Sequence, residues 1–526
     1  MSDSHHEQYE NLSDKQKNRT IWSVIMASSL GTLIEWYDFY IFGSLAVVLA
    51  TKFFPADNPT AAFLSTLATF AAGFVVRPFG ALFFGRLGDL IGRKYTFLVT
   101  LLIMGFSTFL IGCIPSYETI GFMAPVLVLI LRLLQGLALG GEYGGAATYV
   151  AEYAQPGRRG YWTSWIQTTA TAGLFISLIV ILITKTSLSA EEFDSWGWRI
   201  PFWISILMVI VSYFIRKNMK ESPLFAKAKS EGKTSTNPLK ESFGNRFNFK
   251  FVLLALFGAA MGQGVIWYTG QFYAMSFMQK VMNIDTTQVD SLMALALFLG
   301  TPFFVFFGWL SDKVGRKAVM MTGMLVAILA YRPIYSAMFN SVDTAKKEVA
   351  AGGITEKRTV KVHNKIATDS LITFHKEIAY TDGTLMKKDS IVHWSAAGPV
   401  MKDGKAEEPK VTKSIHINDN TRWYLVFLVF IQVIFVTMVY GPIAAFLVEM
   451  FPVRIRYTSM SLPYHIGNGV FGGLLPAVAT YLVTTGKDAG HAGWYLEGLW
   501  YPIGVAAVCL VIGLVYIKNK NQNIHE

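Results

Sequence analysis

Long apolar segments recur along the whole chain, and they constrain its fold more than any other feature of the sequence. A helix of about 20 apolar residues is long enough to cross the hydrocarbon core of a bilayer. Twelve segments meet this length, so we predict an all-α membrane protein with twelve spanning helices. The first six segments are 21–50, 61–85, 95–114, 122–153, 161–186 and 198–216, and the second six are 251–278, 288–310, 318–338, 422–447, 456–484 and 495–517.

The composition agrees with a chain that lipid solvates. It is 52% hydrophobic and 15% charged, whereas an average soluble domain is about 25% charged. The first apolar segment is too long for a signal peptide and has no small-residue cleavage site, so we expect it to be retained. Cys113 and Cys509 lie in separate apolar segments and form neither a disulfide framework nor a metal-binding spacing.

The distribution of Lys and Arg predicts the orientation. One set of short loops, together with Arg216 and the polar stretch 217–250 that follows it, holds 24 of them, and the short loops of the other side hold 5. Cytoplasmic loops carry the excess of positive charge, so we expect both termini and the central loop in the cytoplasm. The net charge of +11 is then a topological signal, and we expect no nucleic-acid partner. The predicted parts are a tail 1–20, a six-helix bundle 21–216, the central loop 217–250, a second bundle 251–517 and a tail 518–526.

An internal repeat relates the two sets of six segments. The pattern G-x-L-x-D-x-x-G-R-K follows the second segment, from Gly85 to Lys94, and recurs 223 residues later, after the eighth segment. A second repeated pair, Glu152 and Glu449, lies 297 residues apart. The sequence therefore predicts two related halves.

The difference between the two offsets locates an insertion. About 74 extra residues entered the second half between Lys317 and Glu449, and the polar stretch 341–420 holds them. By helix count this stretch lies on the outer face, where we expect a small, partly ordered domain with short strands. Its histidines lack the spacing of metal ligands, so we expect no metal site.

Finer motifs resemble one family of transporters. They are Glu35-Trp36-Tyr37-Asp38-Phe39, Arg77-Pro78-Phe79-Gly80, Gln135-Gly136 with Gly140-Gly141-Glu142-Tyr143-Gly144-Gly145, Trp198-Arg199-Ile200-Pro201-Phe202 and Glu221-Ser222-Pro223. With the loop repeat, they resemble the metabolite:proton symporter family of the major facilitator superfamily, which includes α-ketoglutarate, citrate, shikimate and proline/betaine permeases. The resemblance covers nearly the whole chain outside 341–420, although Ala81 stands where a second glycine is common.

The resemblance implies a function and a mechanism. It implies proton-coupled symport of a small metabolite across a bacterial inner membrane, with two halves that rock around a central site. The sequence names no substrate, and both organic acids and zwitterions such as proline or betaine remain open. Arg77 and the lack of the long coiled-coil tail of osmosensing members favour an organic acid.

Ionisable residues inside the predicted spans are candidates for proton coupling, because such residues are costly in lipid. Glu35 and Asp38 lie three residues apart on one helix face, and the fourth segment carries Arg132 and Glu142. Burial disfavours a charged carboxylate whereas a nearby arginine favours it, which makes a switchable site. We expect Asp38 and Arg132 to form the coupling pair, with Glu35 and Glu142 as auxiliary carboxylates. The alternative is a static ion pair that stabilises the bundle.

Candidate substrate contacts come from both halves. Arg77 lies about 12 Å along its helix from Gly85, near the middle of the membrane, where it can clamp a substrate carboxylate. Alternatively, it pairs with a carboxylate of the first or fourth segment. The second half offers polar and aromatic candidates, which interhelical packing also explains: Gln263, Tyr268, Gln271, Tyr464 and His465.

The repeated loops are the predicted cytoplasmic gate. We expect Asp89 and Asp312 to lie near the positive end of the helix that follows each of them. In the superfamily such clusters latch the cytoplasmic side, whereas the alternative reading is a topological signal alone. The residues assigned to this gate are Gly85, Asp89, Gly92, Arg93, Asp312, Gly315 and Arg316.

Three other functions stay open. A proton-independent facilitator is the alternative within transport, and a membrane sensor that uses the outer insertion is the alternative outside it. A membrane enzyme is disfavoured, since the sequence shows no nucleophile–base set, metal cluster or cofactor loop. We expect no cofactor other than the proton as coupling ion, and a monomer whose partners are a small-molecule substrate and the bilayer.

Overall fold

A computed structural model gives the architecture of the chain. It describes residues 13–54, 59–217, 220–362, 370–395, 398–399, 401–402, 405–406 and 409–518. Most of the predicted tails 1–20 and 518–526, and parts of the insertion 341–420, therefore lie outside the described residues.

The first half contains six membrane spans, joined by short helices. The first begins at a capping box, in which Ser13 and Gln16 satisfy each other's backbone N–H groups. The spans are α2 (Asp14–Ser44) continued by α3 (Ala46–Phe53), α4 (Pro59–Leu90), α5 (Arg93–Ile111), α7 (Met123–Tyr153), α8 (Arg159–Gln167) continued by α9 (Thr169–Ser187), and α11 (Ile200–Lys217). The connecting helices are α6 (Tyr117–Ile120), α10 (Ala190–Ser195) and η1 (Gly197–Arg199).

The second half also contains six spans, and two of them include wide π-helical turns. The central loop before it forms α12 (Pro223–Ser230) and η2 (Lys240–Gly244). The seventh span consists of α13 (Arg246–Ala255), η3 (Leu256–Ala260), α14 (Met261–Tyr268), η4 (Thr269–Tyr273), α15 (Ala274–Ser276) and η5 (Phe277–Val281). The others are α16 (Thr286–Val314), α17 (Arg316–Ser341), α18 (Asp419–Tyr440) with α19 (Ile443–Glu449), η7 (Val453–Ile455) with α20 (Arg456–Ile466), η8 (Gly467–Gly472) and α21 (Leu475–Asp488), and η9 (Trp494–Leu499) with α22 (Trp500–Tyr516).

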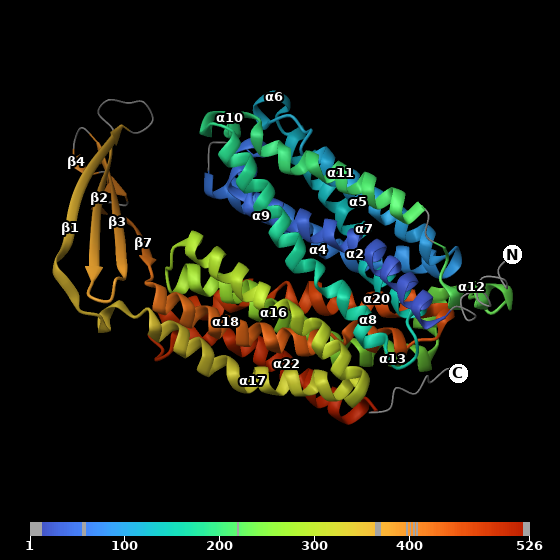
Figure 1. Ribbon diagram of the computed structural model, residues 1–526. Helices are drawn as coiled ribbons and strands as arrows, with labels where there is room; N and C mark the ends of the chain where they lie inside the picture. The colour runs from blue at the N-terminus through green and yellow to red at the C-terminus, as the bar shows by residue number, and fades with distance from the viewer. Residues whose placement is uncertain are drawn as a thin grey trace.

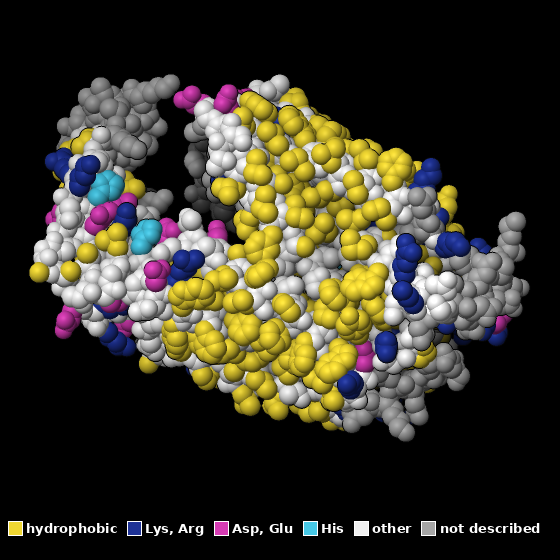
Figure 2. Space-filling model, in the orientation of Figure 1, with side chains coloured by type: hydrophobic (Ala, Val, Ile, Leu, Met, Phe, Trp, Pro, Cys, Tyr) yellow, Lys and Arg dark blue, Asp and Glu magenta, His cyan; other side chains and the backbone are white. Residues whose placement is uncertain are grey.

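The twelve predicted spans are thus present as two six-helix halves. Among the described residues, ten helical segments are long and apolar enough to cross a membrane, and α2 with α3 and α4 complete the twelve. The halves lie side by side, and both termini are at the same end of the bundle (Figure 1). Apolar side chains cover the flank of both halves as a continuous belt, whereas charged side chains gather at the two ends (Figure 2).

Glycines on α4 and α7 bring these two helices into backbone contact. A Cβ at Gly136 would clash with the backbone of Gly73, and one at Gly140 would clash with the carbonyl of Arg77. Small residues allow such close packing where water cannot drive helices together. We call this contact, with Gly80 facing Leu137, the glycine seam.

The insertion between α17 and α18 folds as an antiparallel sheet at the end of the bundle opposite to the termini (Figure 1). Its strand order is β1-β2-β3-β4, and β7 pairs with β3. Strands of up to 14 residues replace the short strands predicted from sequence, because cross-strand pairs stabilise them along their length. The strands are β1 (Val349–Val362), β2 (Ser370–Tyr380), β3 (Leu385–Ser395), β4 (Gly398–Pro399) and β7 (Lys410–His416), and β5 (Met401–Lys402) pairs with β6 (Lys405–Ala406).

The sheet is fixed to the second half. Ile415 on β7 exchanges backbone hydrogen bonds with the segment before α16, donating to the carbonyl of Asn283 at 2.7 Å and accepting from Asp285 at 2.9 Å. The Gln288 side chain bonds both backbone groups of Ile417. We therefore expect the sheet to move together with the second half.

Candidate functional site

Asp38 and Arg132 form a buried ion pair between α2 and α7. The Arg132 Nη1 lies 2.8 Å from the Asp38 carboxylate, and the two residues are 5% and 2% exposed. Gln135, one turn along α7, donates to the other oxygen of Asp38 at 3.0 Å and to Thr108 at 2.7 Å. The contact predicted between Asp38 and Arg132 is present, and their coupling role stays a prediction.

Arg77 on α4 lies beside Glu35 on α2, at 3.3 Å. This is the alternative partner that the sequence left open for Arg77. The Phe74 ring packs on the guanidinium at 4.2 Å, while Tyr268 and His465 of the second half lie within electrostatic reach of it. The Arg77 side chain therefore lies where residues of the two halves come together.

Two buried nitrogen atoms at this place lack partners. Neither Nε of Arg77 nor Nε2 of His465 has a hydrogen-bond partner within the part of the chain that the structure describes. His465 is 3% exposed and also bonds the backbone of Gly140 on α7. Buried polar groups without partners are rare and need an explanation, and a bound solute is one.

Glu142, predicted as an auxiliary carboxylate, lies in an ion pair of its own. It pairs with Arg216 at 2.6 Å and accepts a hydrogen bond from Thr100 at 2.8 Å, and its role in coupling stays a prediction. The sequence had grouped Arg216 with the loop charges after α11. The structure corrects this, since Arg216 is 1% exposed and its guanidinium packs on the Phe97 ring. A long side chain at a helix end can reach inward as well as outward, and the buried carboxylate attracts it.

Replacing Arg216 by alanine is expected to destabilise the first half by about 3–5 kcal/mol, because it leaves the buried Glu142 without its counter-charge. Thermal unfolding of the purified protein in detergent measures the effect. The double change Arg216→Met with Glu142→Gln removes both charges, so it should restore most of the lost stability. A single variant as stable as the double one would contradict this.

The predicted residues of the second half fall into two groups. Tyr464 stacks on Tyr143 of the first half, with ring centroids 3.8 Å apart, and its hydroxyl lies 2.8 Å from that of Tyr440. Gln263 instead exchanges hydrogen bonds with Asn468, at 3.0 and 3.1 Å, and joins the seventh and eleventh spans. Tyr268 lies near Arg77, whereas Gln271 is buried in η4. Tyr464, Tyr268 and His465 thus lie between the halves, and Gln263 is a contact within its own half.

Aromatic contacts between the halves were missed by the sequence reasoning. Trp36 meets Trp267 at 5.0 Å between ring centroids, and Phe39 meets Phe272 at 5.0 Å. Trp36 and Phe39 belong to the first-segment motif that also holds Glu35 and Asp38, which was the available signal. These rings line the same region as the ion pairs of α2.

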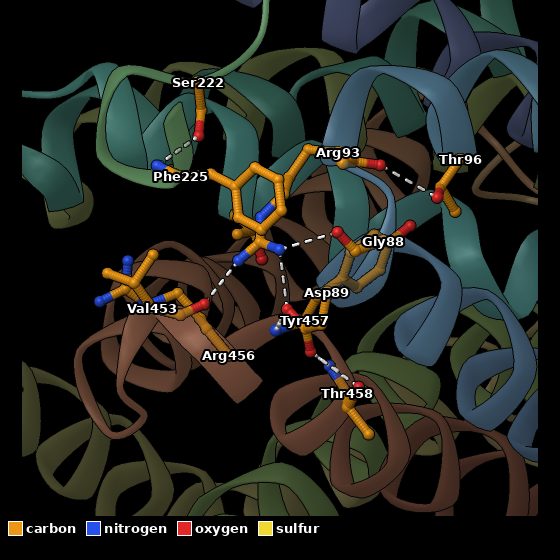
Figure 3. A network of polar contacts seen from close by, with 12 residues as sticks. Gly88, Asp89, Arg93, Thr96, Ser222, Phe225, Val453, Arg456, Tyr457 and Thr458 are labelled. Atoms are coloured by element: carbon orange, nitrogen blue, oxygen red, sulfur yellow. Dashed lines mark hydrogen bonds and ion pairs between the residues drawn. The ribbon is translucent and has the colours of Figure 1, made fainter. Parts of the chain in front are cut away.

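The Asp89 carboxylate joins the two halves at the end of the bundle that holds the termini. Its carboxylate accepts hydrogen bonds from the backbone N–H and the hydroxyl of Thr458, at 2.8 and 2.7 Å, and from the Tyr457 N–H at 3.4 Å. Arg93 lies 2.8 Å from Asp89 and donates to the Val453 carbonyl at 2.6 Å (Figure 3). Asp89 therefore caps the N-terminus of α20 in the opposite half.

Asp312 makes the equivalent contact in the other direction. It accepts hydrogen bonds from the N–H groups of Gly160 and Tyr161, at 2.9 and 2.7 Å, at the N-terminus of α8. Arg316 holds the same carboxylate at 2.6 Å and Glu449 at 3.1 Å. Each aspartate precedes the following helix by four residues, as expected, but its carboxylate caps a helix of the other half. We call the two contacts the cross-half caps.

Glycines give the cross-half caps their geometry. Gly92 and Gly315 have φ of 130° and 99°, which side chains rarely adopt, and they form the tight turns before Arg93 and Arg316. A Cβ at Gly85 would lie 2.9 Å from the Cα of Thr458, so α4 and α20 approach closely there. All seven residues predicted for the gate lie in or beside these contacts.

The central loop reinforces this closed end. Glu152 pairs with Arg93 at 3.5 Å and with Arg456 of the second half at 3.2 Å, and Ser222 donates to it. Glu221 accepts hydrogen bonds from the backbone of Arg93 at 3.1 Å. Burial raises the pKa of the Glu221 carboxyl, although its hydrogen bonds and Arg93 oppose the shift. The described residues include no group of three or more His, Cys, Asp or Glu that could hold a metal.

Comparison with known proteins shows that the chain is similar to transporters. The sugar (and other) transporter family matches residues 23–246. The α-ketoglutarate permease of Escherichia coli is 29% identical over 515 residues, which cover 98% of each chain. The citrate-proton symporter of Salmonella typhi is 29% identical over 479 residues, or 90% of each chain. The chain is thus similar, over nearly its whole length, to transporters named as permeases and proton symporters.

The fold of this chain is also found in a solved structure. A mutant of XylE, the xylose transporter of E. coli, superimposes with a TM-score of 0.62 over 95% of this chain and 96% of that one, at 16% identity. The resemblance drawn from the sequence motifs is thus confirmed. The relatives are permeases and symporters rather than enzymes, and the chain is a multi-pass membrane transporter.

Proposed function

We propose that this chain is a member of the major facilitator superfamily, that it is a proton-coupled symporter of a small organic acid, and that it works by alternating access. One observation carries the proposal: half-buried Arg77 and buried His465, from opposite halves, lie within electrostatic reach of each other, and each keeps a buried nitrogen without a partner. A carboxylate between them would accept hydrogen bonds from both halves. Solute sites of transporters commonly lie at such an interface near the middle of the membrane.

Arg77 explains the preference for an anion. Its guanidinium presents a fork of donors that matches a carboxylate in two-point geometry. The names of two relatives, the α-ketoglutarate permease and the citrate-proton symporter, also point to carboxylate substrates. The bulky rings of Trp36 and Trp267 beside the site limit the solute to a small one.

Coupling follows from competition for Arg77. Glu35 holds the guanidinium at 3.3 Å in this structure, so a substrate carboxylate must displace it. Protonation of Glu35 removes the competing charge and favours substrate binding. Asp38 and Arg132 form the second titratable contact on the same helix, α2. Proton and substrate binding then favour each other, which is the thermodynamic requirement for symport.

The cross-half caps set the state of the transporter. They join the halves at the end that holds the termini, so this end is closed in the structure. With the termini in the cytoplasm, as the loop charges predict, the closed end is cytoplasmic and the sheet lies outside the cell. Transport then requires both caps to open together.

Uptake into proteoliposomes with an imposed pH gradient, acid outside, tests the proposal. The labelled solutes are α-ketoglutarate, citrate, shikimate, proline and glycine betaine, each with and without a protonophore. Accumulation of a carboxylate that collapses with the protonophore supports the proposal. Accumulation of proline or betaine alone would refute the substrate class, and equilibration that ignores the protonophore would make the chain a facilitator.

Replacing Arg77 by lysine is expected to raise KM for a carboxylate by about 10-fold or more, since a lysine cannot form the two-point contact. A neutral or zwitterionic solute should be affected far less. Initial rates of uptake over a range of substrate concentrations measure both. Arg158→Lys, a change of the same chemistry in an exposed loop, serves as the control, and equal losses for charged and neutral solutes would exclude the clamp.

A further inference from the structure

One face of the inserted sheet carries lysines at directly opposed positions. Lys376 on β2 is paired in register with Lys388 on β3, which in turn is paired with Lys413 on β7. Arg358 on β1 lies in the next row of the same face, with its guanidinium 6.0 Å from the Phe374 ring. Four cations therefore share this face, which we call the lysine face.

The lysine face is poorly neutralised. Among the described residues, Glu356 is the one carboxylate that the strands present there, and it lies 2.8 Å from Lys376. Lys388 and Arg358 take part in no ion pair within the described ranges. Lys413 reaches the hydroxyl of Thr344 at 3.5 Å, and Asp343, its nearest carboxylate, already pairs with Lys346 at 3.3 Å.

This arrangement costs the sheet stability. Side chains directly opposite on neighbouring strands are about 5 Å apart at Cβ, and like charges there destabilise the pair. Partial burial lowers the pKa of Lys413, Asp343 opposes this, and Lys388 lowers it further. A solvated face would be expected to alternate the two signs of charge, as Lys387 and Glu377 do on the opposite face, at 3.2 Å.

A cavity lies over part of the lysine face. It has a volume of about 310 Å³, and its lining includes Arg358, Lys376 and Lys388 together with the Glu356 carboxylate, whereas Lys413 lies outside the lining. The space is large enough for a small organic anion. It lies on the sheet, which stands outside the apolar belt of the bundle (Figure 2), and is distinct from the site around Arg77.

We propose that the lysine face is a binding site for a soluble multivalent oxyanion, such as a polycarboxylate. In the cavity the anion would bridge Lys388 and Arg358, and its charge would offset the repulsion between Lys388 and the opposed Lys413 on β7. The guanidinium supplies a two-point contact for one carboxylate, and the ammonium groups hold the others as point charges. The proposal does not depend on symport, because it concerns the sheet alone.

Hydrogen–deuterium exchange of the full-length protein tests the site locally. The protein is placed in nanodiscs of zwitterionic lipid, and citrate or inorganic phosphate is compared with sodium chloride at equal ionic strength. We expect citrate to slow exchange in peptides of β3 and β7 by about two- to fivefold, the range of one favourable cross-strand pair. Peptides from α2 and α4 report on the Arg77 site separately.

Two neighbouring variants separate the site from a general charge effect. Lys388→Gln should abolish the slowing by citrate, whereas Lys387→Gln, with the same change of charge on the opposite face, should retain it. Lys388→Gln should also slow exchange of β3 and β7 without any anion, since it removes the repulsion. The proposal is wrong if citrate and phosphate leave β3 and β7 unchanged in the wild type, or if Lys388→Gln keeps the response. Protection that arises only in nanodiscs of anionic lipid would assign the face to membrane headgroups and would also overturn it.

Discussion

Replacing Asp38 by asparagine is expected to abolish proton-driven accumulation, with a loss of about 100-fold or more in the steady-state gradient of substrate. Asparagine keeps the size of the side chain and its one amide oxygen can still accept from Arg132, but it cannot take up a proton. A transporter that loses its coupling residue still exchanges substrate across the membrane. We therefore expect counterflow, measured with labelled substrate outside and unlabelled substrate inside, to remain within about threefold of the wild type.

Two variants test whether this effect belongs to Asp38. Asp194→Asn changes the same chemistry at an exposed carboxylate that pairs with Lys52 at 2.9 Å, and accumulation should be unchanged. Glu35→Gln removes the competitor for Arg77, so substrate affinity should become high and independent of pH. If Asp38→Asn accumulated substrate normally and Glu35→Gln did not, Glu35 alone would carry the coupling.

Replacing Asp89 by asparagine is expected to open the end of the bundle that holds the termini. The carboxylate accepts several hydrogen bonds at the N-terminus of α20, and each hydrogen bond to a charged group contributes about 1.5–3 kcal/mol. Asparagine keeps a neutral acceptor, so part of this energy is lost and the ratio of open to closed states should rise by about 10-fold or more. Distances between spin labels at Tyr95 and Val314, exposed in the two halves, report the change.

The equivalent contact of Asp312 provides a comparison for the Asp89 variant. Asp312→Asn should open the same end to a similar degree, and the double variant should exceed either one, because two independent contacts then fail. Asp488→Asn, an exposed carboxylate on α21, should leave the distance distribution as in the wild type. Unchanged distances in the double variant would show that the caps do not hold the halves together.

The spans, the repeat and the place of the insertion were predictable from the sequence, because apolar length and offset between motifs are properties of the chain itself. The pair Asp38 and Arg132 was also predictable, since charges inside spans must find each other. The partners of Asp89 and Asp312 were not. Only the packing of the halves brings α8 and α20 to these carboxylates, more than 100 residues away in sequence.

The position of the Arg216 side chain was also not predictable from the sequence. Its position next to Lys217 at the end of a span is typical of a loop charge, and only the three-dimensional position of Glu142 reveals that it turns inward. The extent of the sheet was underestimated for a similar reason, since strand length depends on pairing between β1, β2 and β3 rather than on local composition.

Because of the glycine seam, α4 and α7 are expected to move together as one rigid body. With backbones in contact at Gly73, Gly136 and Gly140, these helices have no room to slide or rotate against each other. The backbone positions of Arg77 on α4 and Arg132 on α7 are therefore fixed relative to each other. The backbones of these two helices cannot adjust to the shape of the solute. Changes in the shape of the site during the transport cycle must then come from α2 or from the second half, where His465 and Tyr268 lie near Arg77.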